Sequence, residues 1–110
     1  MTLLQQMDAE RYRRREVLRD DVRQRLHAAL TELAPVQTVI VFGSLAKPGR
    51  FSETSDVDVA LWSEPAGMST DLLTSLLAER LGRPVDVVLL SECRFRDRIL
   101  REGETWTLLD

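Results

Sequence analysis

Residues 38–61 read TVIVFGSLAKPGRFSETSDVDVAL, and this stretch decides the fold of the chain. Its first five residues, Thr38 to Phe42, are β-branched or apolar, which is typical of a strand buried on both faces. Gly43 ends that strand, and a polar segment with glycine and proline runs on to Ser55. Residues 56–61 alternate strictly and predict a second strand, with Val57, Val59 and Leu61 on one face and Asp56, Asp58 and Ala60 on the other.

Three helices are predicted around these strands. Apolar residues recur every four positions over about residues 8–33, which indicates a long amphipathic helix. A second apolar stripe over residues 72–77 predicts another helix, and Gly82 is a favourable residue for ending it. A third helix is expected over residues 91–101, with Ser91 as its N-cap.

The remaining segments complete a small α+β domain. Residues 85–90 are nearly all apolar and predict a third strand, and residues 106–109 predict a short terminal strand or tail. We therefore expect a small mixed β-sheet with helices packed on one face, and the aspartates on the other. Three aromatic residues carry no functional signature and are expected in the core: Trp62, Phe95 and Trp106.

Two aspartates on one face of a strand, Asp56 and Asp58, need a physical explanation. Aspartate is disfavoured in strands, and a buried carboxylate is costly unless it is paired or bound to a metal. Two carboxylates about 7 Å apart, the i, i+2 spacing of a strand, also repel each other. A divalent cation such as Mg²⁺ removes both penalties. The alternative is that this face is open to solvent and the alternation is ordinary amphipathicity.

The Gly43-Ser44 pair adds a second indication. A glycine directly after a buried strand lets a phosphate approach the backbone closely, because no Cβ blocks it. Backbone N–H groups and the Ser44 hydroxyl can then donate hydrogen bonds to an anion. The following loop carries Lys47 and Arg50. The segment is not a Walker A loop, because the Gly-Lys-Ser/Thr end of that motif is absent.

The combined pattern resembles the signature of the DNA polymerase β-like nucleotidyltransferases, and most of all their minimal nucleotidyltransferase (MNT) branch. Gly43-Ser44 is followed after eleven residues by Asp56-Val57-Asp58-Val59, and Asp86 lies where the family has its third carboxylate. The resemblance covers roughly residues 36–103. Many members carry Arg after the Gly-Ser pair, where this chain has Leu45, so Lys47 or Arg50 is expected to take over its triphosphate contacts.

This resemblance implies a polymerase beta-like fold and a two-metal mechanism. Asp56 and Asp58 would ligate two Mg²⁺ ions and Asp86 the catalytic one, so that all three are expected to be metal ligands and catalytic residues. Nucleotide binding is expected at Gly43, Ser44, Lys47 and Arg50. The implied reaction transfers AMP from ATP to a hydroxyl group, with Asp86 helping to deprotonate that hydroxyl.

The same resemblance suggests a partner protein. MNT proteins are similar to antitoxins that are paired with HEPN-type toxins and adenylylate a tyrosine of the toxin. A single domain over residues 1–110, with a helical segment at 1–34 and a catalytic core at 36–103, leaves little room for an acceptor pocket. A HEPN-type toxin or a second copy of the chain would close the site, and residues 1–7 would pack on it. The alternatives are a non-catalytic toxin- or nucleotide-binding module and a small-molecule, antibiotic-type nucleotidyltransferase.

Composition narrows the possible surroundings. The 110 residues include 15 Lys and Arg against 18 Asp and Glu, a net charge of −3, which argues against direct nucleic-acid binding. The basic run from Arg11 to Arg15 is interpreted as the solvated face of a helix. No apolar stretch approaches the length of a membrane span. Cys93 is alone, which excludes an internal disulfide and favours a reducing, cytoplasmic location.

Overall fold

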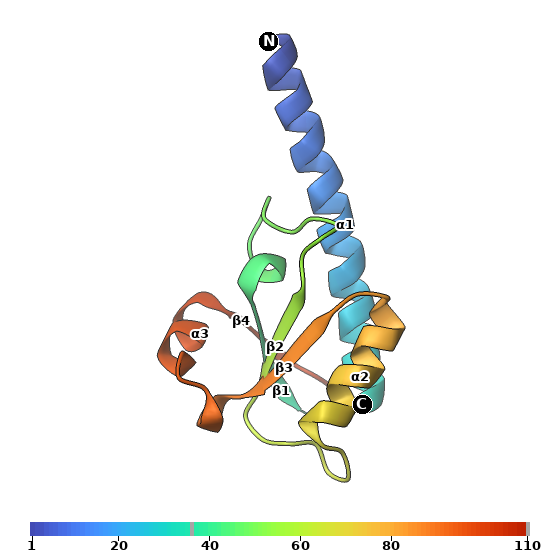
Figure 1. Ribbon diagram of the computed structural model, residues 1–110, viewed down its shortest axis with the longest axis vertical. Coiled ribbons are helices and arrows are strands. Elements are labelled where there is room, and N and C mark those ends of the chain that lie inside the picture. The colour runs from blue at the N-terminus through green and yellow to red at the C-terminus, as the bar shows by residue number, and fades with distance from the viewer. Residues whose placement is uncertain (36, 110) are drawn as a thin grey trace.

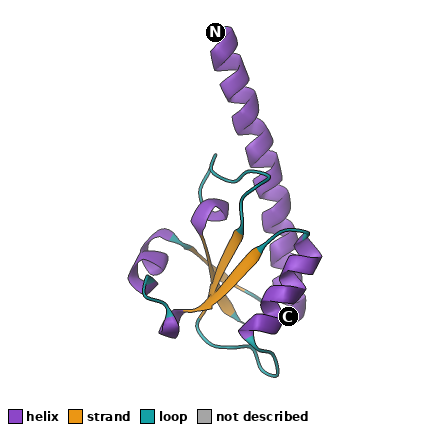
Figure 2. Cartoon of the chain, in the orientation of Figure 1, coloured by secondary structure: helices purple, strands orange, loops and turns teal. Residues whose placement is uncertain are grey.

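A four-stranded mixed sheet forms the centre of the computed structural model, which describes residues 1–35 and 37–109 (Figure 1). The predicted α+β class is confirmed, and Figure 2 shows the helices gathered around the strands. In chain order the elements are α1 (Leu3–Leu33), β1 (Thr38–Phe42), β2 (Val57–Leu61), α2 (Thr70–Leu81), β3 (Val85–Leu89), α3 (Arg96–Glu102) and β4 (Glu104–Thr107). Two short 3-10 turns follow β1 and β3, namely η1 (Gly43–Ala46) and η2 (Leu90–Glu92).

The strand order is β3-β2-β1-β4, so β1 and β2 lie in the middle of the sheet. β1 is antiparallel to β2 and to β4, whereas β2 and β3 are parallel. Parallel strands need a crossover connection, and α2 supplies it between β2 and β3. Because the two parallel strands start in register, Asp58 pairs with Asp86 and the two residues share a face of the sheet.

The main hydrophobic core lies between the sheet and the helices α1 and α2. Leu26 and Leu30 of α1 and Leu73 and Leu77 of α2 are fully buried there against the strands. Burying one such leucine side chain stabilises the fold by about 1.5–3 kcal/mol. On β2 the strand residues that meet these helices are the alternate ones predicted from the sequence, Val57, Val59 and Leu61. On β1 they are Val39 and Val41.

The short helix α3 covers part of the opposite face, so only α1 and α2 share one face as predicted. Ile99 of α3 packs on Ile40 and Ala60 in a small second core. The chain can turn from α3 into β4 this tightly because Gly103 follows the helix. A Cβ atom at Gly103 would collide with the Ile40 side chain and the Ile99 carbonyl oxygen.

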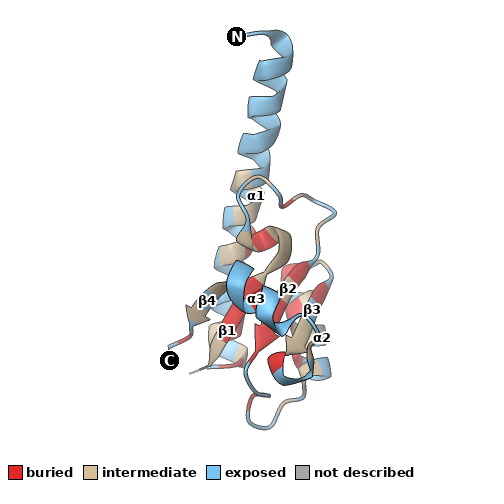
Figure 3. Cartoon of the chain, turned by 90° about the vertical axis from the view of Figure 1, so that its left-hand side faces the viewer, coloured by how far each residue is buried: buried red, intermediate tan, exposed pale blue. Residues whose placement is uncertain are grey.

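Helix α1 extends well beyond the sheet, and residues 1–15 are all exposed (Figure 3). It begins at Leu3, five residues earlier than the apolar stripe indicates. A capping box explains the early start: the Thr2 hydroxyl accepts from the Gln5 N–H, and the Gln5 side chain accepts from the Thr2 N–H. The extension makes the molecule elongated, with extents of 54 × 28 × 22 Å.

Several local predictions were wrong. The helix expected from Ser91 begins only at Arg96, because η2 follows β3 and no side chain caps α3. Trp62 and Phe95 are not core residues, since 47% and 63% of their surface is exposed. Trp106 does pack against the main core and is half-buried.

No helix within the described ranges 1–35 and 37–109 has both the length and the apolar character needed to cross a membrane.

Candidate functional site

The turn after β1 brings the backbone of Gly43 against an aspartate. Gly43 has φ 71°, a left-handed conformation that costs other residues free energy. A Cβ atom at this position would collide with the carboxylate of Asp58. This contact follows from the antiparallel register, in which Phe42 pairs with Asp58. Both the backbone conformation and the lack of space therefore require glycine here.

Asp58 and Asp86 form an acidic pair on the face opposite the main core. They lie side by side on parallel strands, with Asp58 partly buried and Asp86 exposed. Asp56 is exposed and immediately precedes β2. Among the described residues, no salt bridge involves any of these three carboxylates. The pair is thus an uncompensated concentration of negative charge beside the Gly43 turn.

Burial and the neighbouring carboxylates raise the pKa of Asp58 to about 6. Partial burial is the largest cause, because it disfavours the charged form. The negative charges of Asp86 and then of Asp56 add to the effect. A bound cation would act in the opposite direction and favour the ionised carboxylate.

A cavity of about 370 Å³ opens between this face of the sheet and α3. One part of its wall is polar or charged and contains Gly43, Lys47, Asp58, Asp86, Arg98 and Glu102. The other part is mainly apolar and contains Phe42, Val88, Cys93, Phe95 and Ile99. The cavity therefore offers both charged groups and apolar side chains, as a ligand with a polyanionic and an aromatic part requires.

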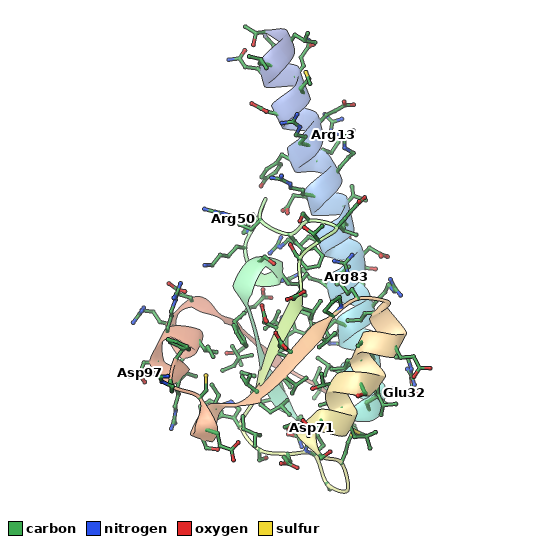
Figure 4. The ribbon with its side chains drawn as sticks, in the orientation of Figure 1. Arg13, Glu32, Arg50, Asp71, Arg83 and Asp97 are labelled. Atoms are coloured by element: carbon green, nitrogen blue, oxygen red, sulfur yellow. The ribbon has the colours of Figure 1, made fainter. Side chains whose placement is uncertain are left out.

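Four of the seven residues singled out from the sequence line this cavity: Gly43, Lys47, Asp58 and Asp86. Ser44 lies in η1, where its carbonyl oxygen accepts from the Lys47 N–H at 3.1 Å. Arg50 is exposed at the tip of the loop and points outward from the domain (Figure 4). Asp56 influences Asp58 through its charge without lining the cavity.

Sequence reasoning missed the contribution of α3. Phe95, Arg98 and Glu102 all line the cavity, and their spacing of three and four residues places them on one helix face. Glu102 accepts a 3.1 Å bond from Arg98 Nε and lies 3.9 Å from Lys47 Nζ. That spacing could have revealed the group, but only if α3 had been placed on the face that carries the aspartates.

Leu45 occupies the position where an arginine was expected to contact phosphate. Its side chain is fully buried in the main core. An arginine directed this way would place its charge among apolar side chains, at a high free-energy cost. The backbone of η1 therefore directs position 45 away from the cavity in this protein.

The donor set suits a cation that takes further ligands from water and substrate. Within the described part of the chain, no three Asp, Glu, His or Cys side chains form a preformed metal cluster. Asp58 and Asp86 instead lie side by side on the wall of the cavity, with Asp58 against the Gly43 turn. Mg²⁺ is commonly held by one or two carboxylates together with water and phosphate oxygens, so these residues fit it.

Comparisons with known proteins agree with the fold. The family model described as "Polymerase beta, Nucleotidyltransferase" matches residues 24–107. A solved chain from the "Crystal structure of the toxin-antitoxin with AMP-PNP" is similar in fold, with a TM-score of 0.59 and 23% sequence identity. The similarity covers 76% of this chain and 72% of that one. No curated protein sequence matches significantly.

Proposed function

The chain belongs to the polymerase beta nucleotidyltransferase family, and on that premise we propose that it transfers AMP from ATP to a hydroxyl group of a partner protein. The observation that carries the proposal is the acidic pair, Asp58 and Asp86, which faces the Gly43 turn inside one cavity. The Gly43 turn would let a phosphate group approach the backbone, the acidic pair would supply carboxylates for Mg²⁺, and the open cavity would admit a second substrate.

The charged lining residues of the cavity would hold the triphosphate. The Gly43 turn admits a phosphate group close to the backbone, and Lys47 contributes positive charge on the same wall. Asp58 and Asp86, with Asp56 beside them, would hold Mg²⁺, most simply as two ions. Bound there, Mg²⁺ supplies charge neutralisation on the phosphates and lowers the pKa of the attacking hydroxyl.

The chemical step is an in-line displacement at the α-phosphorus of ATP. A bond forms between the acceptor oxygen and the α-phosphorus, and the bond from that phosphorus to the bridging oxygen breaks, releasing pyrophosphate. Asp86 is exposed at the cavity, so it can accept the proton that the acceptor hydroxyl gives up. Asp58 is less exposed and keeps its place beside the Gly43 turn.

The apolar lining residues of the cavity would accept the nucleotide base. Phe42 and Phe95 both line it, and the Phe95 side chain is largely exposed. An aromatic side chain that is not packed in the core can stack on a purine ring. Such stacking suits a nucleotide base in general, and ATP is the nucleotide that we propose.

The acceptor is proposed to be a tyrosine of a HEPN-type toxin, which would make the chain an antitoxin. A toxin partner in general is supported by the solved chain of similar fold, which comes from the "Crystal structure of the toxin-antitoxin with AMP-PNP". The exposed extension of α1 offers a contact surface through Leu3, Leu4 and Met7. A second copy of the chain is the alternative occupant of that surface.

Two observations favour a second candidate function, a non-catalytic module that binds the toxin or the nucleotide. Leu45 replaces the expected arginine, and Lys47 is close enough to Glu102 for part of its charge to be neutralised. Such a module would bind Mg-ATP or the partner without turnover.

The test is to incubate the purified chain with Mg²⁺, ATP labelled at the α-phosphate, and the protein encoded by the neighbouring gene. We expect label on a tyrosine of that protein, and none when Asp58→Asn replaces the wild type. Asp71→Asn, an exposed carboxylate of α2, is the matched control and should transfer normally (Figure 4). Binding without transfer would favour the module, and transfer only to a free small molecule would refute a protein acceptor.

A further inference from the structure

The loop that connects the Gly43 turn to Arg50, here called loop 43–50, is held at two points by helix α1. The Gly49 N–H donates a 3.0 Å hydrogen bond to Glu16 Oε2. Arg19 Nε donates a 2.8 Å hydrogen bond to the carbonyl oxygen of Leu45. The two contacts fall at opposite ends of the segment that carries Lys47 into the cavity.

The two helix residues also bind each other. Arg19 Nη1 lies 3.2 Å from Glu16 Oε1, and only 15% and 28% of the respective side chains are exposed. Exposed surface ion pairs contribute little because water screens them, whereas charge-assisted bonds shielded from water are stronger. Glu16 and Arg19 therefore act as one unit, the Glu16–Arg19 strap, which spans the loop.

A third helix residue explains why the loop has glycine at position 49. The Tyr12 ring lies against Gly49 so closely that a Cβ atom there would collide with it. Gly49 also has φ 75°, which disfavours other residues. Arg15 Nη1 reaches the Gly49 carbonyl oxygen at 3.5 Å. One turn of α1 thus contacts Gly49 on several sides.

The loop has few bonds of its own to keep its shape. Beyond the bonds inside η1, its internal backbone bonds run from the Lys47 N–H to Ser44 at 3.1 Å and from the Arg50 N–H to Lys47 at 3.3 Å. Ordering a loop only when a ligand binds costs free energy, which appears as weaker affinity. A loop held in place beforehand avoids that cost.

We propose that Glu16 and Arg19 are positioning residues that hold loop 43–50 in the shape that accepts the triphosphate. The inference rests on the proposed function, since it assigns the loop to nucleotide binding. Both residues, and Tyr12, lie outside residues 24–107, the segment that matches the family model. The N-terminal helix is accordingly part of the nucleotide site of this protein and not only a surface for a partner.

Two variants and a matched control test the strap. Glu16→Ala removes the acceptor of the Gly49 N–H and the partner of Arg19, whereas Glu16→Gln keeps an acceptor and removes the charge. Glu10→Ala is the control, because Glu10 is an exposed glutamate of the same helix. Thermal unfolding of each variant identifies any loss that comes from the fold as a whole.

The first readout is amide hydrogen exchange in the nucleotide-free protein, which does not depend on activity. Opening of a local hydrogen bond raises the exchange rate of its amide. Glu16→Ala should raise the exchange rate of Gly49 at least about tenfold, with Glu16→Gln intermediate and Glu10→Ala unchanged. An unchanged Gly49 rate in Glu16→Ala would overturn the strap, whatever the protein does with nucleotide.

The second readout is the affinity for Mg-ATP and the division between KM and kcat in the transfer assay. Glu16→Ala should raise Kd and KM about tenfold and change kcat by less than about threefold, and Glu16→Gln should recover most of the loss. Faster exchange with an unchanged Kd would overturn the positioning role. Wild-type protein that binds no Mg-ATP would refute the proposed function itself, and its exchange data would still report on the strap.

Discussion

The two faces of the sheet differ in almost every physical respect. The face under α1 and α2 is a dry core of fully buried apolar side chains, such as Leu26, Leu77 and Val59. The face toward α3 has a small core around Ile99 and, beside it, the cavity with Asp58 and Asp86. The same strand β2 serves both faces through its alternation. The face under α1 and α2 supplies most of the hydrophobic stabilisation of the fold. The face toward α3 can therefore carry carboxylates that do not stabilise it.

The largest expected effect is the loss of transfer activity when a carboxylate of the cavity face is replaced. Under the proposed function Asp58 is a metal ligand, so Asp58→Asn should lower AMP transfer by about 10³-fold through the loss of several kcal/mol of charge stabilisation. The fold should remain intact, since the change relieves repulsion on the cavity face. Initial rates with labelled ATP and a thermal melt measure both quantities. If the mutant kept full activity, the cavity face would not be the face that carries the activity.

A substitution on the face under α1 and α2 should lower the stability of the fold and leave nucleotide binding unchanged. Leu77→Ala removes a fully buried side chain of α2 and should lower the free energy of unfolding by about 2–5 kcal/mol. Urea denaturation followed by circular dichroism measures the change. The comparison predicts that any folded fraction still binds Mg-ATP normally. A loss below about 1 kcal/mol would mean that this face is not the main core.

A substitution in the Gly43 turn should have an intermediate effect, which we expect on the affinity for Mg-ATP. Gly43→Val would force a branched residue into a left-handed conformation and against the Asp58 carboxylate. We expect Kd for Mg-ATP to rise at least about tenfold, which corresponds to roughly 1.4 kcal/mol. Isothermal calorimetry is the measurement. Unchanged affinity would place the phosphate site elsewhere.

Stability should respond to pH through the cavity face. In the folded protein the pKa of Asp58 is raised from 3.8 to about 6, so folding favours the protonated carboxyl. That contribution is present below pH 3.8 and is lost as the pH rises through about 6. Asp58→Asn lacks the titration and should gain stability relative to wild type over that window. Urea unfolding in EDTA from pH 4 to 7 would show it, and solvent screening keeps the effect modest.

The smallest effect on nucleotide binding is expected at the N-terminal end of α1. Residues 1–7 are exposed, so deleting them should leave Kd for Mg-ATP within about twofold of wild type. Association with the partner should weaken much more, because Leu3, Leu4 and Met7 are lost as contacts. Light scattering of the full chain and of the truncated chain, each with and without the protein encoded by the neighbouring gene, measures the association. Equal association would move the docking surface elsewhere.

The strands and the packed face could be predicted from the sequence because their pattern is strong. Residues 38–42 are a strand as predicted, and the alternation of residues 57–61 identifies both faces of β2 correctly. The neighbourhood of Asp58 and Asp86 follows from two parallel strands joined by one helix. Sequence reasoning therefore reached the acidic pair and the Gly43 turn.

The parts that could not be predicted depend on tertiary contacts. Helix α3 has seven residues, too few for its apolar stripe to show which face of the sheet it covers. Phe95 and Arg98 were consequently not connected with the site. The contact between Glu16 and Gly49 joins residues 33 positions apart, and no local pattern indicates it. The burial of Leu45 is likewise a property of the packed turn.

The central claim is that the acidic pair beside Gly43 is the metal and nucleotide site. Mn²⁺ broadens the NMR signals of nearby amides, so a titration with Mn²⁺ in the presence of ATP locates the metal directly. The account predicts selective broadening at Gly43, Asp58 and Asp86, with the amides of residues 1–10 and of Asp71 unaffected. Broadening centred on any other part of the chain, or none at these three residues, would contradict it.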